Sequence, residues 1–140
     1  MNNFVPQKKI YKKYQKGKSF NKIAPTHFID TIKVGSIGLK ALNHSRLNSK
    51  QLNAMVKSIK KLIKKTGKLY LKVFPQNPIT NKPVEVRMGK GKGNVCYWVA
   101  NIKLGCILCE IETKKPKIAV KALNNAQIKL PFKTRIFISK

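Results

Sequence analysis

The spacing of apolar residues predicts one long amphipathic helix after residue 48. Apolar side chains recur there at the i, i+3, i+4, i+7 positions of one helix face, namely Leu52, Met55, Val56, Ile59, Leu62 and Ile63. Asn48 suits the N-cap and Gly67 suits the C′ position. The opposite face carries Lys50, Lys57, Lys60, Lys61, Lys64 and Lys65. Lysines four residues apart repel one another, which favours an anionic partner over simple solvation of this face.

Shorter apolar runs predict strands on both sides of this helix. The predicted strands span residues 27–34, 37–42, 68–74, 95–102, 106–111 and 133–138. Residues 75–83 hold three prolines and are predicted to form a loop. A second helix is predicted over residues 118–130, with Pro116 near its start and alanines on one face. Runs of strands with two helices on one side indicate an α+β fold, in which two helices pack on one face of an antiparallel sheet.

The N-terminal stretch differs from the rest of the chain. Residues 1–24 carry seven lysines and no acid, with Tyr11, Tyr14 and Phe20 interleaved. We expect a basic tail that stays extended until it binds a partner, followed by a single domain over residues 25–140. The tail has no apolar core typical of a secretory signal. No stretch approaches the roughly 20 apolar residues of a membrane span.

The charge balance narrows the classes of function. The chain has 31 Lys and Arg residues against 4 Asp and Glu residues, a net charge of +27. Its carboxylates are Asp30, Glu85, Glu110 and Glu112. Such a surface repels itself unless a polyanion supplies the missing charge, and nucleic acid is the leading candidate, ahead of an anionic membrane. Acid–base, metal-dependent and two-carboxylate catalysis all need carboxylates, so we expect no enzyme and no cofactor.

The three cysteines do not form a convincing metal site. Cys106 and Cys109 have C-x-x-C spacing, but they fall in a strand-like run, where residues three apart point to opposite faces. Zinc needs four ligands, and His27 and His44 are distant in the sequence. We therefore expect Cys96, Cys106 and Cys109 to be small buried or half-buried apolar residues.

The segment PVEVRMGKGKGN, residues 83–94, is the strongest candidate for a binding site. Three glycines alternate with basic residues, and the segment lies between the predicted proline-rich loop and a strand. That context excludes both the phosphate loop of nucleotide-binding enzymes and the dinucleotide fingerprint. Either the segment is a flexible solvated turn, or its glycines let the backbone approach folded RNA while Arg87, Lys90 and Lys92 contact phosphates. Glu85 is expected to form a local salt bridge with Arg87 or a lysine.

Several motifs resemble one known family. RMGKGKG followed by Trp98, and KKTGKLYLKVFP at residues 64–75, look like signatures of the universal large-subunit ribosomal protein L-sixteen family. YKKYQKG, GSIGLKAL, NKPVEVRMG and KLPFKT add matches in the same order over residues 8–138. The chain departs from the family at Lys65, where arginine is usual, and at Tyr70, where tryptophan is common. It also reads TKKPK before the second helix, where members often have acidic residues.

The resemblance implies an α+β fold and a role in translation. Members of the family bind large-subunit rRNA near the peptidyl-transferase region, support A-site tRNA and lie beside neighbouring large-subunit ribosomal proteins. By resemblance, the glycine-rich loop would reach towards the functional centre and the tail would thread into rRNA. The candidate rRNA- and tRNA-binding residues are Lys8, Lys9, Tyr11, Lys12, Lys13, Lys16, Lys18, Arg87, Met88, Gly89, Lys90, Gly91, Lys92 and Gly93.

The composition also bears on the cellular compartment. Only three of the 31 basic residues are arginine, and lysine, asparagine and isoleucine are read from A/T-rich codons. Together with the apparent lack of a removable presequence, this favours a mitochondrial ribosome, and a plastid or bacterial cytoplasm would leave the same signs. The competing class is a membrane-surface or non-ribosomal nucleic-acid-binding module, which would bind anionic lipid or duplex DNA equally well. No small-molecule substrate is expected.

Overall fold

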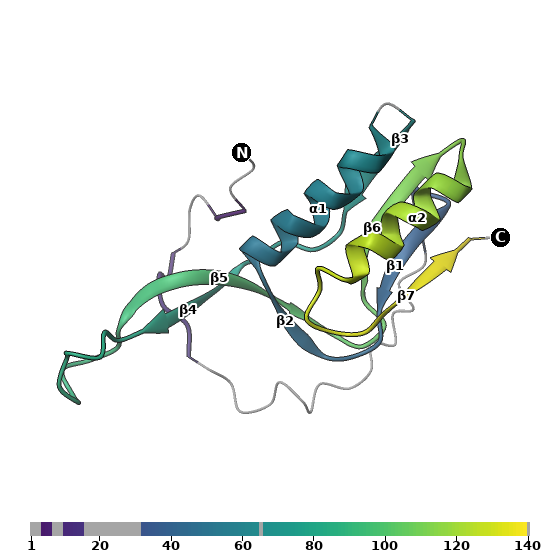
Figure 1. Ribbon diagram of the computed structural model, residues 1–140. Coiled ribbons are helices and arrows are strands. Elements are labelled where there is room, and N and C mark those ends of the chain that lie inside the picture. The colour runs from purple at the N-terminus through teal and green to yellow at the C-terminus, as the bar shows by residue number, and fades with distance from the viewer. Residues whose placement is uncertain (1–3, 7–9, 16–31, 65, 140) are drawn as a thin grey trace.

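The computed structural model describes residues 4–6, 10–15, 32–64 and 66–139, which form an α+β fold with two antiparallel sheets (Figure 1). The first sheet has the strand order β3 (Gly67–Leu71), β6 (Ile107–Thr113), β1 (Ile37–Ala41) and β7 (Thr134–Ile138). The second has the order β2 (Ser45–Asn48), β5 (Asn94–Ile102) and β4 (Asn77–Asn81). The helices are α1 (Ser49–Ile63) and α2 (Pro116–Gln127).

The two helices lie side by side and bury their apolar faces in one core with the first sheet (Figure 1). Small residues on α2 let α1 approach closely. The fully buried members of this cluster include Ile37, Leu39, Leu52, Met55, Ile59, Ile111, Ala122 and Leu123. Removing these apolar groups from water is the main favourable contribution to folding. The predicted α+β architecture is confirmed, although the strands divide between two sheets.

The predicted start of α1 is confirmed and its predicted end is wrong. Asn48 is the N-cap and forms a capping box with Gln51, which satisfies backbone N–H groups at the first turn. The helix ends earlier than predicted, because Lys64 is the C-cap, with a positive φ of 45°. Gly67 instead begins β3. A Cβ on Gly67 would lie 2.6 Å from the carbonyl oxygen of Glu112, so glycine permits the close approach of β3 to β6.

Two of the segment assignments need correction. Residues 75–83 are not a loop throughout, because β4 occupies their centre. β4 is the edge strand of its sheet and pairs only with β5, and an edge strand tolerates Pro78, which has no N–H to donate. β2 was not predicted. In the predicted strand 27–34, residues 27–31 lie outside the described part and residues 32–34 are not in a strand.

The remaining elements lie close to their predicted positions. The strands predicted over residues 37–42, 68–74, 95–102, 106–111 and 133–138 correspond to β1, β3, β5, β6 and β7. The second helix begins two residues before its predicted start, at Pro116. Proline suits that first turn, where its missing N–H would have no partner within the helix.

Residues 33 and 34 are held against the face of the first sheet that points away from the core. Side chains alternate along β6, so Cys109 and Ile111 point into the core and Glu110 points the other way. The Glu110 carboxylate accepts hydrogen bonds from the backbone N–H of Lys33 at 3.3 Å and of Val34 at 3.1 Å. The ammonium of Lys72 lies 3.4 Å from the same carboxylate. Glu110 therefore fixes the chain just before β1.

Candidate nucleic-acid interface

The glycine-rich segment forms the tip of a hairpin. β4 and β5 pair up to Asn81 and Asn94, and the hairpin loop (residues 82–93) joins them. Figure 1 shows this hairpin extending away from the helices, with the loop at the far end from α2. Inside the loop, the Val86 N–H donates to Pro83 O at 3.2 Å, and the Lys82 ammonium donates to Gly89 O. The sequence did not point to Lys82, which closes the loop on itself.

Three consecutive residues at the tip have positive φ angles. They are 95° at Gly89, 51° at Lys90 and 85° at Gly91. A Cβ at Gly89 or Gly91 would meet nothing within 4 Å, so the main chain there is open to a ligand. Glycine is needed at position 93 for a different reason, which is close packing: a Cβ there would lie 2.4 Å from Asn81 O, where the hairpin closes. The glycines thus shape a turn whose backbone a large partner can approach.

The side chains of the hairpin loop project into solvent. Arg87, Lys90 and Lys92 are exposed, and so is Met88, which does not pack inward. Glu85 is also exposed and makes no ion pair among the described residues, so its predicted salt bridge is not formed there. The positive charge of the tip is consequently left for a partner to neutralise.

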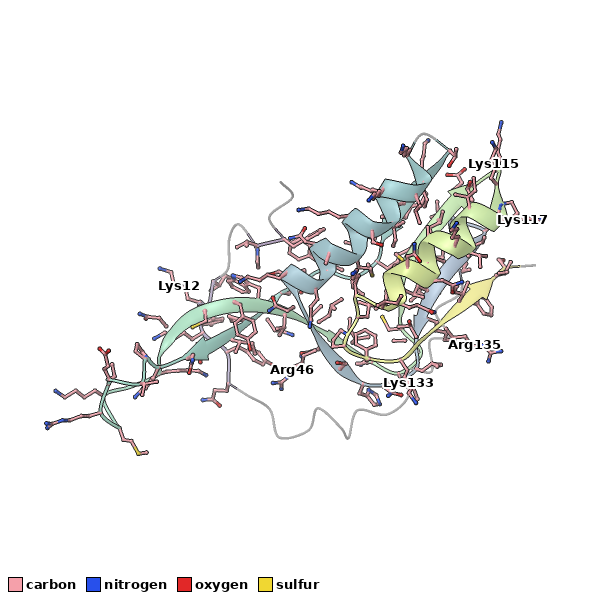
Figure 2. All side chains as sticks on the ribbon, viewed as in Figure 1. Lys12, Arg46, Lys115, Lys117, Lys133 and Arg135 are labelled. Carbon is pink, nitrogen blue, oxygen red and sulfur yellow. The ribbon has the colours of Figure 1, made fainter. Side chains whose placement is uncertain are left out.

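The structure brings part of the tail against this loop. The Lys13 ammonium donates to Lys92 O at 2.7 Å, and the Lys92 ammonium donates to Tyr14 O. Tyr11 and Lys12 are exposed beside them, and Figure 2 shows Lys12 near the hairpin. The other predicted tail residues, Lys8, Lys9, Lys16 and Lys18, lie outside the described residues.

Helix α1 carries the predicted lysine face. Its apolar side is buried in the core, while the lysines described on the other side are exposed: Lys50, Lys57, Lys60, Lys61 and Lys64. Lys65 lies outside the described residues. Further exposed cations occur near the other end of the molecule (Figure 2): Lys115 and Lys117 belong to the TKKPK segment noted above, whereas Lys133 and Arg135 were not among the candidate residues. Lysine is too common in this chain for composition alone to separate binding residues from the others.

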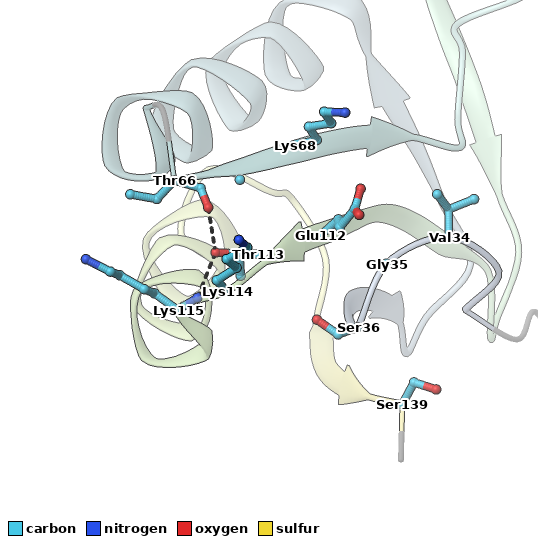
Figure 3. A pocket seen from close by; sticks show the side chains of 11 residues that line it. Val34, Gly35, Ser36, Thr66, Lys68, Glu112, Thr113, Lys114, Lys115 and Ser139 are labelled. Atoms are coloured by element: carbon cyan, nitrogen blue, oxygen red, sulfur yellow. Dashed lines mark hydrogen bonds between the residues drawn. The ribbon is translucent and has the colours of Figure 1, made fainter.

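An open groove of about 900 Å³ lies at one end of the first sheet (Figure 3), where the start of β3, the end of β6, residues 34–36 and Ser139 line it. The Thr113 hydroxyl donates to Thr66 O at 3.0 Å and accepts from the Lys115 N–H at 3.1 Å. Glu112 is its only carboxylate, and that group accepts a hydrogen bond from the Tyr70 hydroxyl at 2.9 Å. This hydrogen bond is the largest of the effects that raise the pKa of Tyr70. A single carboxylate on an open wall provides no acid–base pair.

The burial predicted for the three cysteines is confirmed for Cys106 and Cys109 and wrong for Cys96, which lies at the exposed start of β5. Cys109 is buried, and its burial raises the pKa of the thiol to about 12. Cys106 is half-buried and Cys96 is exposed. Within the described part of the chain, no three His, Cys, Asp or Glu side chains group in a way that could hold a metal ion. Neither of the helices seen there is long and apolar enough to cross a membrane.

A basic α+β protein with an acid-poor, solvent-exposed hairpin belongs to the class of polyanion-binding proteins. Residues 6–137 match the family described as "Ribosomal protein L16p/L10e". The chain is 45% identical to "Large ribosomal subunit protein uL16" of Acinetobacter baylyi over 131 residues, which cover 94% of this chain and 93% of that protein. The proteins of the same name from Psychrobacter cryohalolentis and Psychrobacter arcticus are each 46% identical with the same coverage. The chain therefore belongs to the ribosomal protein L16p/L10e family, as its motifs indicated, and is not an enzyme.

Proposed function

We propose that this chain is a structural constituent of the large ribosomal subunit, which binds large-subunit rRNA near the peptidyl-transferase region and supports A-site tRNA. The observation that carries this proposal is the exposed hairpin loop, whose three basic side chains project from a turn of open backbone. Membership of a ribosomal protein family makes RNA the natural polyanion. Neighbouring large-subunit ribosomal proteins complete its partners.

The mechanism is charge neutralisation combined with recognition of shape. Lysines bind backbone phosphates with little dependence on sequence, whereas arginine can make two parallel hydrogen bonds to a phosphate or a guanine. The residues assigned to this contact are Lys8, Lys9, Tyr11, Lys12, Lys13, Lys16, Lys18, Arg87, Met88, Gly89, Lys90, Gly91, Lys92 and Gly93. Residues 1–24 act as an RNA-threading tail and residues 25–140 as one rRNA-binding domain. The lysine face of α1 adds a broad contact with phosphates.

Sucrose-gradient sedimentation tests the assembly part of this proposal. The chain is followed by mass spectrometry in native extract, and we expect it to stay with the large subunit through a moderate-salt wash. Sedimentation as free protein, or equal binding to anionic vesicles and duplex DNA, would support the competing membrane-surface or non-ribosomal class instead.

Replacing Arg87 by alanine tests the loop itself. We expect Arg87→Ala to impair translation strongly while the free energy of unfolding stays within about 0.5 kcal/mol of the parent, because the side chain is exposed. Arg135→Ala is the matched control, since it removes the same charge from an exposed position on β7. Equal losses of translation in both variants would contradict a specific role for the loop.

The compartment is a separate part of the proposal. The low share of arginine and the abundance of lysine support a mitochondrial ribosome on coding grounds. The relatives compared above are bacterial, which fits a bacterial cytoplasm as well. Fractionation of organelles before sedimentation separates the two, because the chain will follow the ribosomes of only one fraction.

A further inference from the structure

Two segments far apart in the sequence hold each other by a pair of reciprocal contacts. The Lys13 ammonium donates to Lys92 O at 2.7 Å, and the Lys92 ammonium donates back to Tyr14 O. Each lysine therefore binds the main chain of the segment that carries the other. We call this arrangement the lysine clasp. It joins residues 10–15 of the tail to the hairpin loop, residues 82–93.

The clasp leaves most of the hydrogen-bonding capacity of both lysines unused. An ammonium group has three donors, and a single carbonyl oxygen accepts from one of them. Both side chains are exposed, so the remaining donors face solvent. Among the described residues no carboxylate pairs with either lysine, and Glu85 is the only acid in the two segments. Two cations on joined segments, each without a counter-ion, favour the binding of an anion beside them.

The position of the clasp determines which anion fits. It lies where the tail runs beside the hairpin (Figure 1), and both of its lysines are exposed, which suits an extended polyanion more than an enclosed small molecule. The unused donors of each ammonium group can bond to phosphate of an RNA backbone while the bond to the carbonyl is kept. The main chain at Gly89 and Gly91 is open on the same loop.

We propose that the tail and the hairpin loop bind RNA as one coupled unit, in which backbone phosphate bridges Lys13 and Lys92. The proposal rests on the proposed function, because it takes RNA as the partner, and it adds that the two elements do not act independently. Bound phosphate screens the two charges from each other and strengthens the clasp. The clasp in turn presents tail and loop to the RNA in one arrangement.

A double-mutant cycle measures this coupling. The probe is a large-subunit core particle from which this chain has been removed by a salt wash, and the dissociation constant of the re-added full-length chain is measured by sedimentation. Lys13→Met and Lys92→Met keep the aliphatic length but remove the charge and the donors. We expect each to weaken binding about 10-fold, as loss of a charge-assisted hydrogen bond does. The double variant should be weaker by about 10- to 20-fold, well short of the 100-fold of two independent losses.

Lys12→Met provides the matched control. Lys12 is next to Lys13 and equally exposed, but it makes no contact with the loop among the described residues. In the double variant of Lys12→Met and Lys92→Met, the two fold-increases in dissociation constant should therefore multiply. The dependence of binding on salt concentration should also lose about one unit of slope for each lysine removed.

The outcomes separate this inference from the proposed function. If the Lys13–Lys92 pair is as multiplicative as the control pair, tail and loop bind independently and the clasp has no role, while the ribosomal function stands. If the unmodified chain does not return to the core particle at all, the proposed function fails and the inference fails with it. Unfolding curves followed by fluorescence of Trp98, the single tryptophan, verify that every variant is folded.

Discussion

Replacing Glu110 by glutamine tests how the chain before β1 is attached to the sheet. The side chain is only 1% exposed, and its two oxygens accept hydrogen bonds from the backbone N–H groups of Lys33 and Val34. Lys72 provides the nearby positive charge at 3.4 Å. Glutamine has nearly the same volume but only one acceptor oxygen, and its amide donors would face a backbone N–H that has lost its partner.

These contacts set the size of the expected loss in the free energy of unfolding. A buried donor left without an acceptor destabilises by about 1–3 kcal/mol, and hydrogen bonds to charged groups lie at the upper end of that range. Loss of the contact with Lys72 adds little, because that side chain is about a third exposed and solvent screens it. We therefore expect Glu110→Gln to lower the free energy of unfolding by about 2–3 kcal/mol at pH 7.

The dependence on pH gives a second measurement with a definite sign. Burial by itself would raise the pKa of Glu110, but the N–H groups of Val34 and Lys33 and the ammonium of Lys72 outweigh it, so the pKa is lowered. A lowered carboxyl pKa stabilises the fold above the unfolded pKa, about 4.3, and this stability is lost as the pH falls through the folded pKa. The difference between parent and Glu110→Gln should therefore shrink below about pH 4.

Urea unfolding followed by Trp98 fluorescence measures both effects. Glu112→Gln is the matched control, because Glu112 is the next acid on β6 but is exposed, and its carboxylate accepts a hydrogen bond from the Tyr70 hydroxyl rather than from backbone N–H groups among the described residues. We expect the control to change stability by less than about 0.5 kcal/mol. If Glu110→Gln loses no more stability at pH 7 than this control, and its stability falls with acid as the parent's does, then Glu110 does not hold the chain before β1.

Three further predictions concern the hairpin, the cysteines and the first helix. Gly93→Ala should accelerate amide hydrogen exchange across β4 and β5 far more than Gly91→Ala, because a Cβ at position 93 would strike Asn81 O. Position 91 is open and bears only the strain of a positive φ, about 1 kcal/mol, so similar exchange in both variants would contradict this prediction. At pH 8 a thiol reagent should label exposed Cys96 at once and Cys109, whose burial raises its pKa to about 12, only after unfolding, as mass spectrometry of digests can show; native labelling of both at one rate would contradict the burial. Asn48→Ala should lower the urea midpoint by an amount equivalent to about 1 kcal/mol through loss of the N-cap, and an unchanged midpoint would count against the capping box.

Local patterns explain which elements could be predicted. Helix α1 was found because its apolar face repeats within fifteen residues and its N-cap is adjacent, so neighbouring residues contain the whole signal. β2 and β4 were missed because both are short and polar, and β4 contains a proline. They are strands because β5 pairs with β4 through its first half and with β2 through its second half. A short window of sequence does not contain the strand with which it will pair.

Within the candidate site, too, the features made by neighbouring residues could be predicted and those made by distant residues could not. The hairpin loop was recognisable because its glycines and basic residues are consecutive. Its contact with the tail was not, because Lys13 and Lys92 are separated by 79 positions. The salt bridge expected at Glu85 is not formed among the described residues, and the carboxylate that does hold backbone is Glu110, 76 positions from Val34.

Charge adds up over a chain whatever its conformation, so the excess of +27 could be read from the sequence, and it favours a polyanion as the partner. The sequence by itself also determined the family, since the loop motif is contiguous. Three features became visible only in the folded chain: β4 and β5 extend that loop away from the core, Lys13 and Lys92 join the tail to it, and Glu110 fixes the chain before β1. These contacts depend on pairings between distant segments, which form only when the whole chain has folded.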